Sequence, residues 1–292
     1  MIPRPLLFAV ALCVLSCGSS SGGTSGSADG GGSTNSITLA SQTYTLQPGD
    51  EKFYCYTMTL PSDVVATAFT PKYGDATHHV VFAQTLALEP NGFSECDVFF
   101  KTTWSPLFVG GKGTTPLQLP QGAGMKLTKG TQILLQLHLL NSGTTAITDT
   151  TSVTMDVAAD PTAPFTPAGI YGLDDEKISI PANAAGFQES MPCTIDKPLN
   201  IFAYFGHMHR LGTHLSITRN GSPFLDEDWN FDVQPTTAKA LTLNPNDKLQ
   251  LTCTYTNTTT NPVTFGESTK NEMCVAVFYY TKFDGLDGCQ SQ

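Results

Sequence analysis

The chain reads QILLQLHLL from Gln132 to Leu140, and this stretch decides the fold class. Every second residue from Ile133 to Leu139 is aliphatic, and side chains two positions apart in a strand lie on one face. That face must belong to a hydrophobic core. His138 lies on the other face, so we expect its imidazole to be available to a surface or a cleft. A period of two predicts a strand rather than a helix.

Short alternating runs of this kind recur from about Ile37 to Val157 and again from about Ile178 to Phe283. The segment between them, residues 158–169, reads AADPTAPFTPAG and holds three prolines, which a central strand does not accept. We therefore predict an all-β protein of two consecutive antiparallel β-sandwich, jelly-roll-like domains. The predicted domains cover residues 37–160 and 165–289.

The N-terminal segment has the features of an export signal. In residues 1–16 a single basic residue, Arg4, precedes an apolar run that is too short to cross a membrane as a helix. The sequence VLSC ending at Cys17 resembles a bacterial lipobox, and a Gly- and Ser-rich tether continues to residue 36. We expect lipidation of Cys17 and an exported bacterial lipoprotein, anchored by lipid alone in the periplasm, outer membrane or cell surface. The alternative is an ordinary signal peptide with an incidental cysteine.

Composition excludes some classes of protein. The formal net charge of −10 argues against a nucleic-acid partner. The 26 glycines and 19 prolines, with only 14% charged residues, favour strands and turns. An even number of cysteines after Cys17 predicts disulfides in an exported chain, and no Cys-x-x-Cys spacing supports a zinc ribbon. These cysteines are Cys55, Cys96, Cys193, Cys253, Cys274 and Cys289.

Five of the six histidines occur in three short contexts. His207 and His209 are two apart in a predicted strand, so both imidazoles project to one face and can chelate one ion. His78 and His79 are adjacent, and a regular strand would turn them to opposite faces. If both serve one metal, the strand must end or bulge at this point. His138 is the third context.

Met273 is a sixth candidate ligand, in the sequence NEMC from Asn271 to Cys274. A thioether is a soft ligand and, together with imidazole, selects copper over zinc, magnesium or calcium. Three imidazoles form one possible set, and two imidazoles with the thioether form another. The sequence thus predicts two copper sites with different ligands. Alternation places Met273, Val275 and Val277 on one strand face and Cys274 on the opposite face.

Several motifs surround these candidate ligands. They are THHVVFA at 77–83, QLHLLN at 136–141, IFA at 201–203 with HMHRLG at 207–212, CTYTN at 253–257, and GES at 266–268 with NEMC at 271–274. In this order and spacing the chain resembles the copper type II, ascorbate-dependent monooxygenases, the family of dopamine β-monooxygenase and peptidylglycine α-hydroxylating monooxygenase. The resemblance covers nearly the whole chain after the tether.

The resemblance implies two copper ions per chain, one in each sandwich, with a solvent-filled cleft between them. The electron-storing copper would be held by His78, His79 and His138. The copper that binds dioxygen and cleaves the substrate C–H bond would be held by the catalytic ligands His207, His209 and Met273. The implied reaction hydroxylates a small organic substrate with O₂ and a reductant such as ascorbate.

The resemblance also implies disulfide pairs, which are Cys55–Cys96, Cys193–Cys289 and Cys253–Cys274. We expect a catalytic core alone, carried on the tether. Phe205 and Val277 stand where the peptide-amidating branch has an arginine and a tyrosine, so a glycine-extended peptide is not the expected substrate. A cleft near Phe205, Val275 and Val277 would be apolar and would favour a small, partly aromatic or aliphatic substrate. His214 has no assigned role, and we expect it at the surface or behind a ligand.

Two other functions are compatible with these residues. The first is a copper-binding or copper-storing lipoprotein that has the same sites but does not turn over. The second is a three-histidine zinc hydrolase in which Met273 is core packing. The complete ligand set favours the monooxygenase, because storage does not require a pair of distinct sites.

Overall fold

A computed structural model describes residues 35–96, 101–282, 285 and 287–291. These residues form 23 strands and no helix, which confirms the all-β prediction. Among them there is consequently no helix long and apolar enough to cross a membrane. The predicted signal peptide, Cys17 and most of the tether lie outside the described residues. The first strand begins at Asn35, two residues earlier than the predicted domain.

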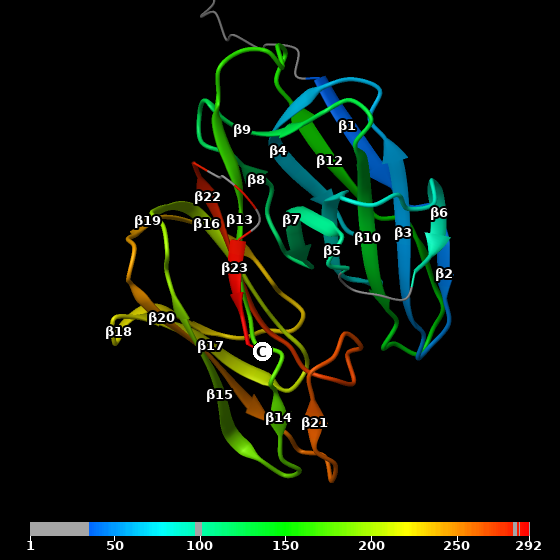
Figure 1. Cartoon of the computed structure of the whole chain (residues 1–292). Coiled ribbons are helices and arrows are strands. Elements are labelled where there is room, and N and C mark those ends of the chain that lie inside the picture. The colour runs from blue at the N-terminus through cyan, green and yellow to red at the C-terminus, as the bar shows by residue number, and fades with distance from the viewer. Residues whose placement is uncertain (1–34, 97–100, 283–284, 286, 292) are drawn as a thin grey trace, which may run out of the picture. The chain divides into compact units, whose positions relative to one another are not determined.

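The N-terminal half is a sandwich of two sheets (Figure 1). One sheet contains β1 (Asn35–Ala40), β12 (Ser152–Val157), β4 (Val64–Lys72), β8 (Leu117–Gln118) and β9 (Ala123–Leu127). The other has the order β6 (Gly92–Glu95), β3 (Glu51–Thr59), β10 (Gln132–Leu140), β5 (Thr77–Thr85) and β7 (Trp104–Gly111). A small ribbon pairs β2 (Tyr44–Leu46) with β11 (Ile147–Asp149).

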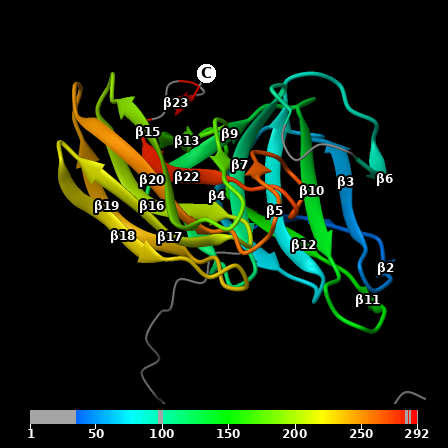
Figure 2. The ribbon, with the colours of Figure 1, turned by 90° about the horizontal axis from the view of Figure 1, so that it is seen from below.

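The C-terminal half is a second sandwich (Figure 2). Its first sheet contains β13 (Thr166–Asp174), β22 (Cys274–Thr281), β16 (Leu199–Met208) and β19 (Thr236–Leu243), with β23 (Asp287–Gln290) beside β13. The second has the order β15 (Ala185–Thr194), β20 (Lys248–Thr256), β17 (Gly212–Arg219) and β18 (Ser222–Asp228). A ribbon pairs β14 (Ser179–Ile180) with β21 (Val263–Thr264).

One sheet runs through both halves, because β9 pairs with β13 in parallel. β13 and β23 are also parallel, whereas the other paired strands of the described residues are antiparallel. The described residues form one compact unit. The proline-rich segment 158–169 has no strand up to residue 165, but its last four residues, Pro167 among them, belong to β13, so the expectation that the whole segment lies outside the strands is wrong. The domain limits given by the sequence stay a prediction.

The alternation in β10 is confirmed. Ile133, Leu135, Leu137 and Leu139 are fully buried in the core of the N-terminal sandwich. His138 lies on the opposite face, as expected, but it is not at a surface, since its exposed fraction is 0%. His209 of the C-terminal half lies against this face, with its ring centroid 6.4 Å from that of His138. Burial of His138 on this face of β10 is therefore a consequence of packing between the halves.

Strand β22 carries the packing between the two halves. Its even-numbered residues from Cys274 to Tyr280 belong to the core of the C-terminal sandwich, whereas Val277 and Tyr279 belong to the core that extends from the N-terminal half. The Tyr279 hydroxyl donates to the Val109 carbonyl at 3.0 Å and accepts from the Val109 amide at 2.9 Å. The alternation predicted for this strand is therefore confirmed.

The expectation of an apolar cleft near Phe205, Val275 and Val277 is wrong. Phe205 and Val277 are 1% and 6% exposed and belong to the shared core, and Val275 packs against it. Apolar side chains at this place are stabilised more by packing against each other than by facing water. The substrate class inferred from that cleft consequently loses its support.

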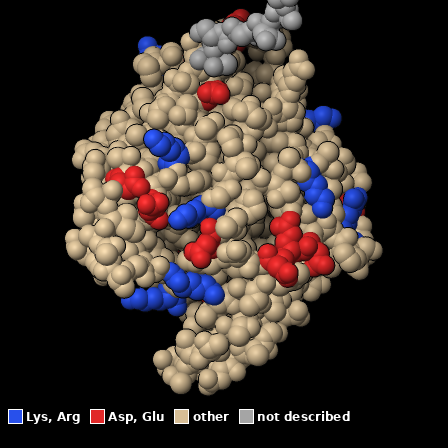
Figure 3. Space-filling model, turned by 180° about the vertical axis from the view of Figure 1, so that it is seen from behind, with Lys and Arg blue, Asp and Glu red and all other residues tan. Residues whose placement is uncertain are grey.

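The three disulfide pairs implied by the resemblance are present, namely Cys55–Cys96, Cys193–Cys289 and Cys253–Cys274. Cys253–Cys274 joins β20 to β22 and so links the two sheets of the C-terminal sandwich immediately after Met273. One face of the molecule, drawn in Figure 3, has charged side chains in small separate groups of both signs. That distribution agrees with the low content of charged residues.

Candidate metal centre

A β-bulge places the adjacent histidines of β5. In the pairing of β10 with β5, His138 stands opposite His79 and Leu139 stands opposite Thr77, so His78 is the extra residue. The irregularity predicted here is therefore confirmed. It turns both imidazoles toward one cluster, with ring centroids 4.9 Å apart. Their exposed fractions are 5% for His78 and 1% for His79.

His207 and His209 stand at the end of β16, and their ring centroids are 5.1 Å apart. Glu272, fully buried, fixes the turn that follows. Its carboxylate accepts from the His209 amide at 2.9 Å and from the Leu211 amide at 2.6 Å. Burial raises the pKa of Glu272 to about 7 although these hydrogen bonds lower it. The sequence motif contained Glu272, but its role as an anchor was not predicted.

Five imidazoles from both halves gather in one buried cluster. The His79 and His207 rings are 4.8 Å apart between centroids, and His78 lies 5.5 Å from His207 and 5.7 Å from His209. One ligand nitrogen from each of His78, His79 and His207 lies within 4.8 Å of the others. The expectation that solvent separates the two ligand sets is thus wrong here, because the halves pack directly at the histidines.

Gln234 bridges the two sets and was missed in the sequence. It is 0% exposed, and its Oε1 accepts from His207 Nδ1 at 2.9 Å. Its Nε2 donates to the Phe231 carbonyl at 2.9 Å and lies 3.5 Å from His78 Nδ1. Gly111 permits this approach, since a Cβ there would lie 2.5 Å from Gln234 Oε1. A single glutamine in a loop carries no sequence signal that could have identified it.

Glu51, at the start of β3, was also missed. Its Oε1 accepts from His138 Nε2 at 2.8 Å and from the Thr269 amide at 2.6 Å, and its Oε2 accepts from the Ser268 hydroxyl at 2.8 Å. Burial raises the pKa of Glu51, but these hydrogen bonds outweigh it and bring the pKa down to about 2. One carboxylate therefore holds a candidate ligand of the N-terminal half and a loop of the C-terminal half.

Met273 is 2% exposed and follows Glu272 directly, just before β22. The same segment contacts His209, because the Asn271 carbonyl accepts from His209 Nδ1 at 3.0 Å. The Met273 carbonyl accepts from the Tyr255 hydroxyl at 2.9 Å. The thioether is thus buried on the segment that holds one of its predicted partners. His214 lies apart from the cluster, partly exposed on β17, and bonds Asp226 and Asp228.

The chemistry of the cluster fits a metal that prefers nitrogen and sulfur ligands. Burial lowers the pKa of all five imidazoles, to about 4 for His207, so the rings are neutral, which is the state that binds metals. His78 Nε2, His138 Nδ1 and His209 Nε2 are buried without a hydrogen-bond partner among the described residues.

The opposite ring nitrogens of two of these histidines are held by oxygens. They are His138 Nε2, which bonds Glu51, and His209 Nδ1, which bonds the Asn271 carbonyl. Metal-binding histidines usually have such partners, which fix the tautomer and the orientation of the ring. Imidazoles, together with a buried thioether on the segment that bonds His209, match the ligand types of copper.

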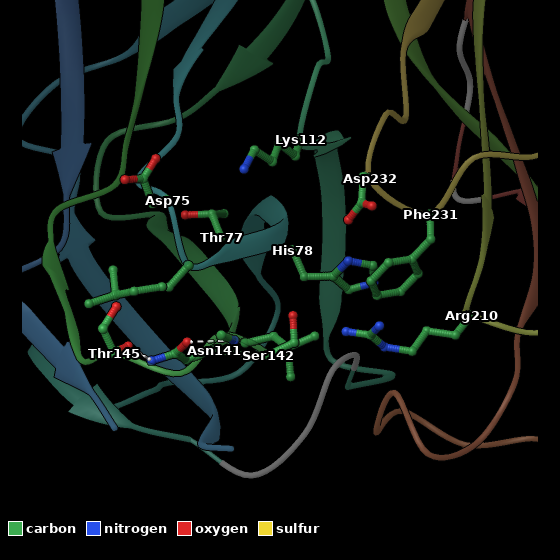
Figure 4. Close-up of a pocket in the computed structure, with 14 residues that line it drawn as sticks. Asp75, Thr77, His78, Lys112, Asn141, Ser142, Thr145, Arg210, Phe231 and Asp232 are labelled. Carbon is green, nitrogen blue, oxygen red and sulfur yellow. Dashed lines mark hydrogen bonds between the residues drawn. The ribbon is translucent and has the colours of Figure 1, made fainter. Parts of the chain in front are cut away.

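A cavity of about 190 Å³ opens beside this cluster (Figure 4). Both halves line it, through Thr77, His78 and Asn141 on one side and Arg210 and Phe231 on the other. Of the cleft expected between the two sandwiches, the structure contains this cavity. A second cavity, of about 460 Å³, lies beside Trp229 and Gly206.

Comparison with known proteins gives a family for the C-terminal half. Residues 166–292 match the family described as copper type II ascorbate-dependent monooxygenase, C-terminal domain. A human protein named DBH-like monooxygenase protein 2 is 26% identical over 283 residues. The alignment covers 84% of this chain and 56% of the relative, so the chain spans little more than half the length of that relative.

Two solved structures resemble the fold weakly. The major capsid protein P2 of bacteriophage PM2 is 9% identical, covers 86% of this chain and 98% of its own, and has a TM-score of 0.35. Broad bean stain virus is 10% identical, covers 85% of this chain and 80% of its own, and has a TM-score of 0.28. At these scores neither likeness bears on function.

Proposed function

The chain belongs to the copper type II, ascorbate-dependent monooxygenase family, and on this premise we propose that it hydroxylates a C–H bond of a small organic molecule with O₂. The observation that carries the proposal is the buried cluster of five neutral imidazoles contributed by both halves. Burial of five imidazoles costs desolvation free energy, and such buried clusters of perturbed titratable groups are typical of functional sites.

We propose that the chain holds two copper ions. The first would have the ligands His78, His79 and His138. The second would have the ligands His207, His209 and Met273. Copper would supply the change between Cu(I) and Cu(II) that O₂ chemistry requires, and the thioether would favour Cu(I). His78, His79 and His138 would hold the ion that stores an electron, and His207, His209 and Met273 would hold the ion at which O₂ is used.

The residues of the chain orient the proposed ligands and exclude water from the site. Gln234 and Glu51 fix the His207 and His138 rings, and each also contacts the opposite half. All six proposed ligands are at most 5% exposed, so the site excludes bulk water. Exclusion of water strengthens electrostatic interactions and limits side reactions of reduced oxygen. The packing of the halves is therefore part of the site.

A small substrate agrees with the size of the cavities. The larger one, about 460 Å³, is within the range of small-molecule sites. It lies beside Trp229, whose indole donates to the His209 carbonyl at 3.1 Å and has its ring centroid 6.1 Å from that of His207. The substrate would therefore approach the second copper from the side of Trp229.

Copper loading and oxygen uptake test the proposal. We expect two copper ions per chain and uptake of O₂ that depends on ascorbate and on one member of a panel of small organic substrates. The hydroxylated product should form in a one-to-one ratio with O₂. Copper binding with only uncoupled oxidation of ascorbate across the panel would support the storage protein instead. One zinc ion without a second site would support the hydrolase and refute the copper proposal.

We also propose that the protein is exported and anchored through lipid on Cys17. The lipobox-like VLSC and the tether after it support this proposal. Cys17→Ser should release the protein from the membrane fraction without changing its copper content. If the variant stays with membranes to the same extent as the natural chain, lipid anchoring at Cys17 is refuted.

A further inference from the structure

Trp229 lies between the second set of proposed ligands and water, and the proposed hydroxylation gives the oxidation of its indole no role. The indole N–H donates to the His209 carbonyl at 3.1 Å, and the ring centroid lies 6.1 Å from that of His207. The half-buried residue lines the larger cavity, of about 460 Å³. Asp228 and Val233 line the same cavity and have exposed side chains, so water reaches it.

Backbone groups hold the indole in this position. The Trp229 amide donates to the Thr213 carbonyl at 3.0 Å, and the indole N–H bonds the backbone of His209. The ring packs on Gly212, where a Cβ would lie 2.9 Å from Trp229 Cδ1. A larger residue at 212 would therefore displace the ring. Because these contacts involve backbone atoms, they fix the place of the indole beside the histidines.

Trp229 is the aromatic side chain at this place that gives up an electron most readily. Phe205 also stacks on His207, with centroids 6.2 Å apart, but a benzene ring is far harder to oxidise than an indole. Tyr255 donates its hydroxyl to the Met273 carbonyl at 2.9 Å and is 0% exposed. A tyrosine loses its phenolic proton when it is oxidised, and a carbonyl is too weak a base to accept that proton.

The surroundings of Trp229 stabilise a temporary positive charge on its ring. Glu227 and Asp228 line the same cavity, and no lysine or arginine is among the described residues that line it. Carboxylates close to a cation lower its energy. The indole N–H can keep its proton, because its acceptor is the His209 carbonyl. An electron can therefore leave the ring without a proton transfer.

We propose that Trp229 is a redox relay that discharges the metal centre when no substrate is bound. The inference rests on the proposed function, which supplies an O₂-derived oxidant at the second ligand set. Without a C–H bond to attack, this oxidant removes one electron from the indole. A one-electron reductant in the cavity, an enediol such as ascorbate, then returns an electron to the indole radical cation.

The electrons and atoms of this side reaction balance. Reduction of O₂ to two water molecules takes four electrons and four protons. Two electrons come from the reduced metal centre, two pass one at a time through Trp229, and water supplies the protons. The ligands are spared, in particular Met273, because a thioether is readily oxidised to the polar sulfoxide. The relay thus protects the site in turnovers that do not reach product.

Oxidation of the ligands without substrate tests the relay. The copper-loaded full chain consumes O₂ with ascorbate, and peptide mass spectrometry measures the oxygen added to Met273, His207 and His209 for each O₂ consumed. In Trp229→Phe this oxidation should be several times faster than in the natural chain. Trp229→Tyr also lacks the indole N–H but keeps an oxidisable ring, so it should restore most of the protection. Equal damage in the two variants would show a structural role and refute the relay.

The matched control is Trp104→Phe, which makes the same change at the other tryptophan. Trp104 is 1% exposed and packs in the N-terminal half against Cys55 and Val81. Its replacement should leave the oxidation of the ligands unchanged. The two tryptophans of the natural chain give a second control that requires no variant. When ascorbate is limiting, Trp229 should be oxidised faster than Trp104, and equal oxidation of both would contradict the relay. Circular dichroism and copper content show whether each variant is folded and loaded.

Paramagnetic resonance separates this inference from the proposed function. The reduced chain is mixed with O₂ without substrate and frozen at once. The natural chain should show an indole radical, Trp229→Tyr a tyrosyl radical, and Trp229→Phe neither. No radical in the natural chain, or equal oxidation of the ligands in the natural chain and Trp229→Phe, would refute the relay alone. Absence of copper-dependent O₂ consumption would refute the proposed function, and the relay with it.

Discussion

Replacing Glu51 by glutamine tests how the two halves are held at the metal centre. The substitution keeps the size of the side chain and removes its charge. In the structure the carboxylate accepts hydrogen bonds from His138, Ser268 and Thr269, and its side chain is only 15% exposed. A glutamine amide can accept at one oxygen only and presents an NH₂ group to the remaining donors.

The magnitude follows from the pKa of Glu51, which falls from 4.5 to about 2. At ~1.4 kcal/mol for each tenfold change in the protonation equilibrium, this difference corresponds to ~3 kcal/mol of folding stability at pH 7. A lowered pKa means that the contribution is complete above the unfolded pKa. It is lost as the pH falls from about 4.5 to about 2.

The assay is urea unfolding of the metal-free natural chain and of Glu51→Gln between pH 2 and pH 7. The variant should be less stable by ~3 kcal/mol at pH 7, and this deficit should shrink toward zero near pH 2. Glu95→Gln is the control, because Glu95 pairs with Lys52 at 3.6 Å with 59% of its side chain exposed. A surface pair of this kind contributes less than ~1 kcal/mol. A deficit no larger than that of the control, or one that does not change with pH, would refute the reasoning.

Three further predictions concern single residues. Met273→Ile should abolish hydroxylation and leave one copper per chain, measured by metal analysis, and loss of both coppers would contradict separate sites. Gln234→Ala, which removes the acceptor at His207 Nδ1, should weaken copper binding at the second site roughly 10- to 100-fold in competition titrations, whereas the exposed Gln188→Ala should not. Burial raises the pKa of Asp174 to about 7, so its contribution to stability is complete below about pH 4 and is lost as the pH rises through 7. Asp174→Asn should remove the part of this decline that lies between pH 5 and pH 8, at most ~3 kcal/mol in unfolding free energies from urea titrations, and an unchanged decline would show that another group causes it.

The candidate ligands and the strand pattern could be found in the sequence because they are local. The alternation of β10 is visible in consecutive residues of the sequence. It was sufficient to predict that His138 lies on the strand face opposite the core. For His78 and His79 to serve one site, the strand had to end or bulge there, since successive side chains in a strand point to opposite faces, and the structure has a bulge. The disulfide pairs could be assigned only through the resemblance, because six cysteines allow fifteen pairings.

The tertiary structure alone decided what surrounds the ligands. Glu51 and Ser268 are 217 residues apart in the sequence, and His78 and Gln234 are 156 residues apart. No local sequence pattern could therefore predict their contacts. The same holds for the cluster of histidines from both halves and for the cavity that Arg210 and Lys112 line. Sequence by itself determined which side chains can bind a metal, because that depends on residue type and strand period. Packing between the sandwiches decided where they meet and what fixes them, because those contacts form only after distant strands are brought together.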